Sequence, residues 1–131
     1  MKKEFTDHSA ALRLDLLGFN EPCFGYYLCK RSDLPVELEI TTWVDLLPYD
    51  SSSCKAPTYQ QAFRFFREKY KLEGIVQGHE DSAVYKFTIW TYLENSKQLR
   101  YAGYEYPSYE EAEKSCLISL IQIAEMLKHE Q

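Results

Sequence analysis

The clearest hydrophobic pattern in this 131-residue chain belongs to two amphipathic helices in its C-terminal half. Apolar residues recur every three or four positions, first at Tyr59, Ala62, Phe63, Phe66 and Tyr70, and later at Ala112, Cys116, Leu120, Ile123 and Leu127. A capping box, a hydroxyl followed three residues later by Gln or Glu, precedes each stretch at 58–61 and 108–111. The pattern predicts helices over 58–72 and 109–128, with Gly74 as the stop of the first.

Between these helices, apolar and polar residues alternate as they do in half-exposed strands. Residues 83–93 place Tyr85, Phe87 and Ile89 on one side and Lys86, Thr88 and Trp90 on the other. A short strand is expected to start at Ile75, residues 94–97 predict a hairpin loop, and residues 99–106 predict a returning strand. Residues 57–131 therefore predict an α-β-β-β-α unit.

The first 56 residues predict a helix followed by a hairpin. Ala10, Leu14 and Leu17 share one helical face, Thr6 or Asp7 can cap the helix, and Gly18 can close it. Residues 23–29 and 34–40 have strand character, whereas residues 41–47 fit either a strand or a helical turn.

Three consecutive serines in 48–55 predict a linker and a boundary between parts 1–56 and 57–131. The predicted fold class is α+β: a small antiparallel sheet packed against the two C-terminal helices, with the N-terminal helix and β-hairpin as an extension. We expect the two parts to form one compact domain together.

The charge distribution argues against nucleic-acid binding. The net charge is −5, with 6 basic and 9 acidic residues in 1–56 and 9 and 11 in 57–131, so neither part has the basic excess that phosphate binding requires. The α-β-β-β-α order is that of double-stranded RNA-binding domains, but Glu110, Glu111 and Glu113 occupy the helix start where a phosphate would dock. The candidate nucleic-acid contacts are Arg64, Arg67, Lys69 and Lys71, and the alternative reading is a solvated helix face.

The chain start lacks the apolar run of a secretion signal, and no segment has the ~20 apolar residues of a membrane span. We therefore predict a cytoplasmic protein with reduced thiols at Cys23, Cys29, Cys54 and Cys116. The cysteine spacing does not predict a zinc site. The sequence has no phosphate-binding glycine loop and no nucleophile elbow, so it predicts no cofactor and leans toward a non-enzymatic role.

Three segments resemble a family of small uncharacterised proteins of Bacteroides-type gut bacteria, their prophages and their phages. They are 14–24 (LDLLGFNEPCF), 56–70 (APTYQQAFRFFREKY) and 108–113 (SYEEAE) with the apolar helix that follows. Members of this family often carry Trp where this chain has Phe65. The resemblance implies an origin on or near mobile DNA and a cytoplasmic setting, and it brings no assigned activity.

The predicted function is therefore the binding of another protein or of a second copy of the chain. Ile118 and Ile121 lie off the apolar stripe of the last helix, and if exposed they would form a self-association patch for a homodimer. Cover by the N-terminal helix and hairpin is the alternative for these two residues. The rival functions are nucleic-acid binding through the basic residues of 64–71 and small-ligand binding in a tyrosine-lined pocket, suggested by the 11 tyrosines.

Overall fold

The computed structural model describes residues 2–28, 37–40, 53–80, 82–93 and 95–129. It has α+β architecture, as predicted, with two three-stranded antiparallel sheets among the described residues. The chain divides into two compact units, Met1–Gln61 (unit 1) and Ala62–Gln131 (unit 2). This division falls inside a helix, α2 (Tyr59–Phe65), a few residues beyond the predicted boundary at 56/57.

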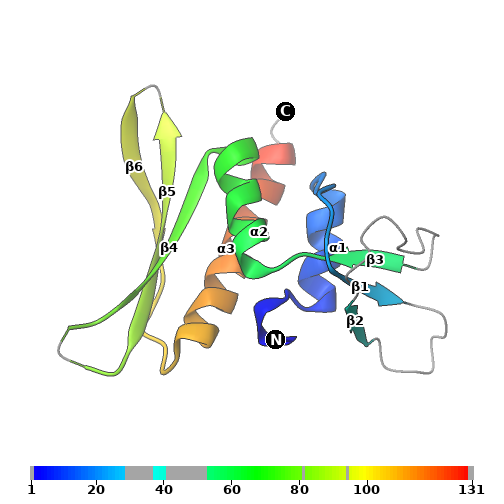
Figure 1. Ribbon diagram of the computed structural model, residues 1–131. Helices are drawn as coiled ribbons and strands as arrows, with labels where there is room; N and C mark the ends of the chain where they lie inside the picture. Colours follow the sequence, from blue (N-terminus) through cyan, green and yellow to red (C-terminus); the bar gives the residue numbers. More distant parts are fainter. Residues whose placement is uncertain (1, 29–36, 41–52, 81, 94, 130–131) are drawn as a thin grey trace. The chain divides into compact units, whose positions relative to one another are not determined.

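Unit 1 contains a three-stranded sheet beside one helix (Figure 1). Its elements are η1 (Lys2–Glu4), α1 (His8–Leu16), β1 (Gly25–Leu28), β2 (Leu38–Ile40) and β3 (Ser53–Ala56), with strand order β2-β1-β3. The antiparallel pairing of β1 with β2 confirms the predicted hairpin. The linker predicted over 48–55 is wrong at its end, because Ser53–Ala56 pairs with β1. Residues 41–52 lie outside the described residues, so the rest of that prediction has no outcome.

The ends of α1 follow their sequence signals. The carboxylate of Asp7 accepts from the backbone N–H of Ala10 at 2.8 Å and caps the N-terminus. Gly18 has φ 99, and the N–H of Phe19 donates to the carbonyl of Leu14 at 3.0 Å. Gly18 can adopt this left-handed conformation because it has no Cβ.

Unit 2 has one helix packed on one face of an antiparallel sheet (Figure 1). After α2, which starts in unit 1, come η3 (Phe66–Tyr70), β4 (Leu72–Gly78), β5 (Tyr85–Leu93), β6 (Ser96–Ala102) and α3 (Tyr109–His129). The strand order is β4-β5-β6, and α3 packs against β4 and β5. The predicted α-β-β-β-α order is therefore confirmed.

Several boundaries in unit 2 differ from the prediction, among them the start of β4, which is Leu72 and not Ile75. The first helix does not run to Gly74: it widens into the π-helical turn η3 and ends at Lys71, whose φ of 58 is left-handed, while Gly74 lies inside β4. The adjacent residues Phe65 and Phe66, at the junction of α2 and η3, are both buried. Strand β6 begins at Ser96, three residues before the predicted start, because Asn95 supplies a tight turn with φ 96.

Both predicted capping boxes form hydrogen bonds. At α2, the N–H of Gln61 donates to the Thr58 hydroxyl at 3.2 Å, and the Thr58 N–H donates to the Gln61 side chain at 3.0 Å. At α3, the N–H of Glu111 donates to the Ser108 hydroxyl at 3.2 Å. Each box stabilises its helix start by supplying acceptors for backbone N–H groups that have no partner within the helix.

Candidate protein-binding face of unit 2

The sheet of unit 2 has two chemically different faces. Phe87 and Ile89 lie on the face covered by α3 and are 2% and 0% exposed. Thr88, Trp90 and Tyr92 alternate with these residues in β5 and point to the opposite face. Their cross-strand neighbours on that face are Ile75 and Glu73 in β4, and Leu99 and Lys97 in β6. We call this surface the outer sheet face; it consists of Glu73, Ile75, Thr88, Trp90, Tyr92, Lys97 and Leu99.

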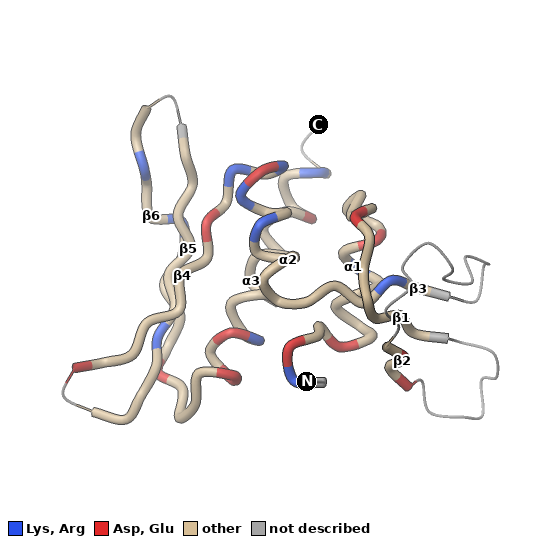
Figure 2. Tube along the Cα trace, viewed as in Figure 1, with Lys and Arg blue, Asp and Glu red and all other residues tan. Residues whose placement is uncertain are grey.

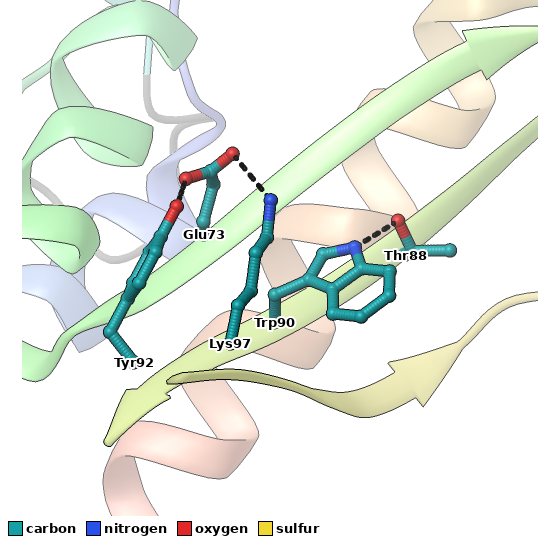
Figure 3. Close-up of polar contacts among 5 residues, drawn as sticks. All are labelled: Glu73, Thr88, Trp90, Tyr92 and Lys97. Carbon is teal, nitrogen blue, oxygen red and sulfur yellow. Dashed lines mark hydrogen bonds and ion pairs between the residues drawn. The ribbon is translucent and has the colours of Figure 1, made fainter. Parts of the chain in front are cut away.

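A polar network holds the aromatic rings of the outer sheet face in place (Figure 3). The Lys97 ammonium lies 3.6 Å from a carboxylate oxygen of Glu73, and it lies 5.2 Å from the ring centroid of Trp90 and 5.7 Å from that of Tyr92. The Tyr92 hydroxyl donates to the other Glu73 oxygen, and the Trp90 indole N–H donates to the Thr88 hydroxyl at 2.9 Å. The polar ends of both aromatic side chains are therefore satisfied within the face.

The same network sets the electrostatics of the face. The hydrogen bond to the Glu73 carboxylate raises the pKa of the Tyr92 phenol, because the protonated phenol is the form that donates this bond. The charges of Glu73 and Lys97 balance each other. What remains is aromatic and apolar area beside paired polar groups, a combination common at protein interfaces.

Strand β6 is the edge of the sheet next to this network. All seven of its residues are exposed, including Leu99 at 53% and Tyr101 at 43%. Ile89 pairs with Tyr101 and Trp90 pairs with Leu99, so Arg100 is the extra residue of a β-bulge. An edge strand presents N–H and C=O groups that its own sheet does not pair.

The basic residues predicted as nucleic-acid contacts lie together at one end of unit 2. Arg64 is in the last turn of α2, Arg67 and Lys69 are in η3, and Lys71 follows it; all four are exposed. The Lys69 ammonium lies 5.6 Å from the ring centroid of Phe65. Figure 2 shows Lys and Arg on η3 and on β6 toward the same end of the sheet, and Asp and Glu around the start of α3 toward the other.

The predicted self-association patch is not formed as expected. Ile121 is 0% exposed, so its expected position off the buried face of α3 is wrong, whereas Ile118 is 37% exposed. At ~100° per residue, Ile121 extends the buried face formed by Ala112, Cys116, Leu117, Leu120 and Ala124. The buried face is therefore wider than the single stripe used for the prediction. Self-association itself stays a prediction.

The alternation of 83–93 had placed Trp90 opposite Phe87, but it did not identify the outer sheet face as a site. The sequence pattern predicts a loop at Lys97, but this residue lies in β6, and its contact with Glu73 joins strands β4 and β6, which do not pair with each other. The signal available in the sequence was the presence of Trp90 and Tyr92 at positions where a half-exposed strand usually carries polar residues.

The described cysteines, Cys23, Cys54 and Cys116, are buried and form no disulfide with one another. Burial raises the pKa of Cys23 and of Cys116 to about 12. Among the described residues, no three His, Cys, Asp or Glu side chains lie close enough to hold a metal ion. Cys29 lies outside this part of the chain. No helix in the described ranges is long and apolar enough to cross a membrane.

Comparisons of the chain with protein-family models, with curated proteins and with solved structures found no match in any of the three.

Proposed function

We propose that this protein acts by binding another protein through the outer sheet face of unit 2, without catalysing a reaction. The observation that carries this proposal is the exposure of Tyr92 and Leu99, 42% and 53%, beside a Trp90 ring held by Lys97 and Thr88. Burying exposed apolar area on association is favourable, and Trp and Tyr are enriched among the residues that dominate interface energetics.

The network lowers the cost of binding. Side chains that are already fixed lose less conformational freedom when a partner docks. Glu73 holds both the Tyr92 hydroxyl and the Lys97 ammonium, so the rings on either side of Lys97 are positioned before the partner arrives. The partner that fits this surface presents an apolar centre for Leu99 and acidic groups for the exposed cations of β6, Lys97 and Arg100.

The resemblance of 14–24 and 56–70 to proteins of gut bacteria and their phages supplies the proposed setting, the cytoplasm of a phage-infected or prophage-bearing cell. Proteins of mobile elements commonly act on proteins encoded alongside them. The neighbouring open reading frames are therefore the set of partners to test.

The test displays fragments of those reading frames and selects for binding to the full chain. Each selected fragment is then titrated against two variants, Leu99→Glu on the outer sheet face and Met126→Glu on α3, which replace side chains of similar exposure, 53% and 57%. We expect Leu99→Glu to weaken binding at least tenfold, since it places an additional charge in the contact, and Met126→Glu to leave it within twofold. If a fragment loses binding only with Met126→Glu, its binding site is on α3 and not on the outer sheet face.

A second candidate is the binding of single-stranded nucleic acid at the basic end of unit 2. The clustering of Arg64, Arg67, Lys69 and Lys71, with Lys69 near Phe65, favours it, because such proteins combine a basic groove with stacking rings. The test is the anisotropy of a labelled 15-nucleotide strand at about 150 mM salt, with Arg64→Glu/Arg67→Glu as the comparison. Equal anisotropy with both proteins would reject this candidate.

A further inference from the structure

We propose that the partner adds to β6 as a fourth strand of the unit 2 sheet, and that it carries acidic side chains beside Lys97 and Arg100. This inference rests on the proposed function and specifies the chemistry of the partner. It concerns the edge of the outer sheet face, where an extended segment can use backbone and side-chain contacts together.

The backbone argument comes from the position of β6. In the order β4-β5-β6, its pairing partner is β5, and the pairing runs from Leu93↔Ser96 to Thr88↔Ala102. In an antiparallel strand, alternate residues direct their N–H and C=O groups away from that partner. All seven residues of β6 are exposed, so these outward groups are accessible to an incoming strand.

The charge argument decides which strand fits. Strand β6 contains two cations, Lys97 and Arg100, and no acidic residue. Opposite charges across a strand pair are stabilising, whereas like charges are destabilising. A second copy of β6 would bring four cations onto one ladder without an acid. An acidic segment would pair with Arg100 and would share the Lys97 ammonium with Glu73.

The described basic residues near β6 also favour an acidic partner. The N–H of Tyr92 donates to the carbonyl of Lys71, which brings the start of β4 beside the end of β5. Figure 2 shows the cations of η3 and β6 toward this end. Charges farther away than about 8 Å are largely screened at physiological salt, so at this edge the charges of β6 itself, Lys97 and Arg100, count for more than the net charge of −5.

The outer sheet face also predicts a spacing in the partner. Lys97 and Leu99 point to the same face because they are two residues apart in one strand. A strand paired with β6 therefore places an acidic residue beside Lys97 and an apolar residue beside Leu99, two positions apart. The Lys97 ammonium, which lies 3.6 Å from Glu73, can also contact a carboxylate of the partner. Arg100, at the bulge, can contact another carboxylate of the partner.

The experiment titrates the full chain with three blocked ten-residue peptides and follows backbone amide resonances. The first peptide repeats Glu-Thr-Val-Thr, so that Glu and Val lie two positions apart on one strand face; the second has Lys in place of Glu; the third keeps the first sequence with alternate backbone amides methylated. We expect the acidic peptide to bind at least tenfold more tightly than the other two and to shift resonances of β6 and β5. Equal affinity of the Glu and Lys peptides, or shifts confined to other elements, would overturn the proposal.

Protein variants provide the second half of the test. Lys97→Glu/Arg100→Glu should reverse the preference in favour of the Lys peptide, and Lys97→Gln/Arg100→Gln, which avoids a new charge beside Glu73, should abolish the preference. The matched control is Lys114→Glu/Lys128→Glu on α3, which changes the net charge equally and should retain the preference for Glu. An unchanged preference in the β6 variants would overturn strand addition.

Two outcomes separate this inference from the proposed function. If a selected protein fragment loses binding with Leu99→Glu but not with Lys97→Gln/Arg100→Gln, the outer sheet face is the site and the acidic strand is wrong. If neither change matters to the fragment, the proposed function fails as well. Sedimentation of the wild type as a dimer that Leu99→Pro at the β6 edge makes monomeric would assign β6 to a second copy and overturn the acidic partner.

Discussion

Gly74 shows how one residue determines the packing of unit 2. A Cβ atom at this position would lie 2.7 Å from the Cys116 sulfur and 3.0 Å from a methyl carbon of Leu120. Glycine therefore lets strand β4 approach α3 closely. The sequence pattern had assigned Gly74 to a helix end, whereas its role is to leave space for a buried thiol.

We predict that Gly74→Ala lowers the free energy of unfolding by about 1–3 kcal/mol, the usual cost of overpacking a core. The same substitution in a Cys116→Ala background should cost about 1 kcal/mol less, because the sulfur that clashes is gone. Urea unfolding of the four proteins measures this coupling. Gly78→Ala is the control, since its Cβ would meet Tyr85 at an ordinary 3.4 Å; additive effects of Gly74→Ala and Cys116→Ala would contradict the packing argument.

The buried thiol of Cys116 also predicts a pH dependence. Burial raises its pKa in the folded chain to about 12, from 9.0. Between pH 9 and pH 12 the thiol of the unfolded chain loses its proton, whereas the thiol of the folded chain keeps it. The contribution of the buried thiol to the free energy of unfolding is therefore fully present below about pH 9 and falls as the pH rises. From pH 8 to pH 10.5, Cys116→Ala should lose about 2 kcal/mol less stability than the wild type. Parallel losses in urea unfolding at the two pH values would show that the thiol does not contribute.

At the scale of elements, the end of the first helix of unit 2 depends on backbone conformation. The π-helical turn of η3 ends at Lys71, which has φ 58 and ψ 36 and whose ammonium donates to the Glu68 carbonyl at 3.2 Å. A non-glycine residue in this left-handed conformation is strained. Lys71 therefore holds a position that glycine would adopt at a lower cost.

Lys71→Gly should raise the free energy of unfolding by about 0.5–1 kcal/mol, because the strain is removed at a compatible site. Lys69→Gly, which removes the same charge from within η3, should lower it by about 1 kcal/mol. Thermal melting of both variants compares the two directions. A loss of stability in Lys71→Gly as large as that in Lys69→Gly would mean that the side chain of Lys71 outweighs its backbone strain.

Helix α3 has a buried face wide enough to include Ile121 and an edge where Ile118 is exposed. We expect Ile121→Glu to lower the free energy of unfolding by more than about 3 kcal/mol, since it places a charged carboxylate in an apolar core. Ile118→Glu should cost less than about 1 kcal/mol. Chemical denaturation measures the loss of unfolding free energy in each variant. Similar losses would mean that both isoleucines are buried. Sedimentation of a folded Ile118→Glu variant then tests whether this edge contributes to self-association.

At the scale of the whole molecule, charge determines which partners can approach. The net charge is −5, and in unit 2 the Lys and Arg of η3 and β6 lie toward one end of the sheet, whereas the carboxylates at the start of α3 lie toward the other (Figure 2). Burial and the neighbouring Glu110 raise the pKa of Glu113, which follows the first turn of α3. An acidic helix start opposes phosphate docking even though the α-β-β-β-α order matches that of RNA-binding domains.

We therefore predict that duplex RNA and duplex DNA bind with dissociation constants above about 10 µM near 150 mM salt, weaker than specific complexes. Fluorescence anisotropy with a labelled 20-base-pair duplex measures this. Glu110→Gln/Glu111→Gln is the informative comparison, because removing the carboxylates should strengthen the weak binding. Sub-micromolar affinity of the wild type would contradict the prediction and favour the nucleic-acid candidate.

Local signals in the sequence were sufficient for the α+β class, the order of elements in unit 2, both capping boxes and the two faces of β5. These features depend on residues a few positions apart, through helical periodicity, strand alternation and side-chain hydrogen bonds to nearby backbone. Asp7, Gly18, Thr58 and Ser108 act within a turn of their own positions, so their roles could be predicted without a fold.

Tertiary structure decided what depends on residues far apart in the chain. Strand β3 forms because Ser53–Ala56 pairs with β1, and Gly74 became a packing position because α3 lies against it. Ile121 is buried because the buried face of α3 is wider than one stripe. The outer sheet face exists because Glu73, Trp90 and Lys97 meet across three strands. Periodicity along a chain shows which residues share a face, whereas only pairing between strands shows which faces join and which side chains remain exposed.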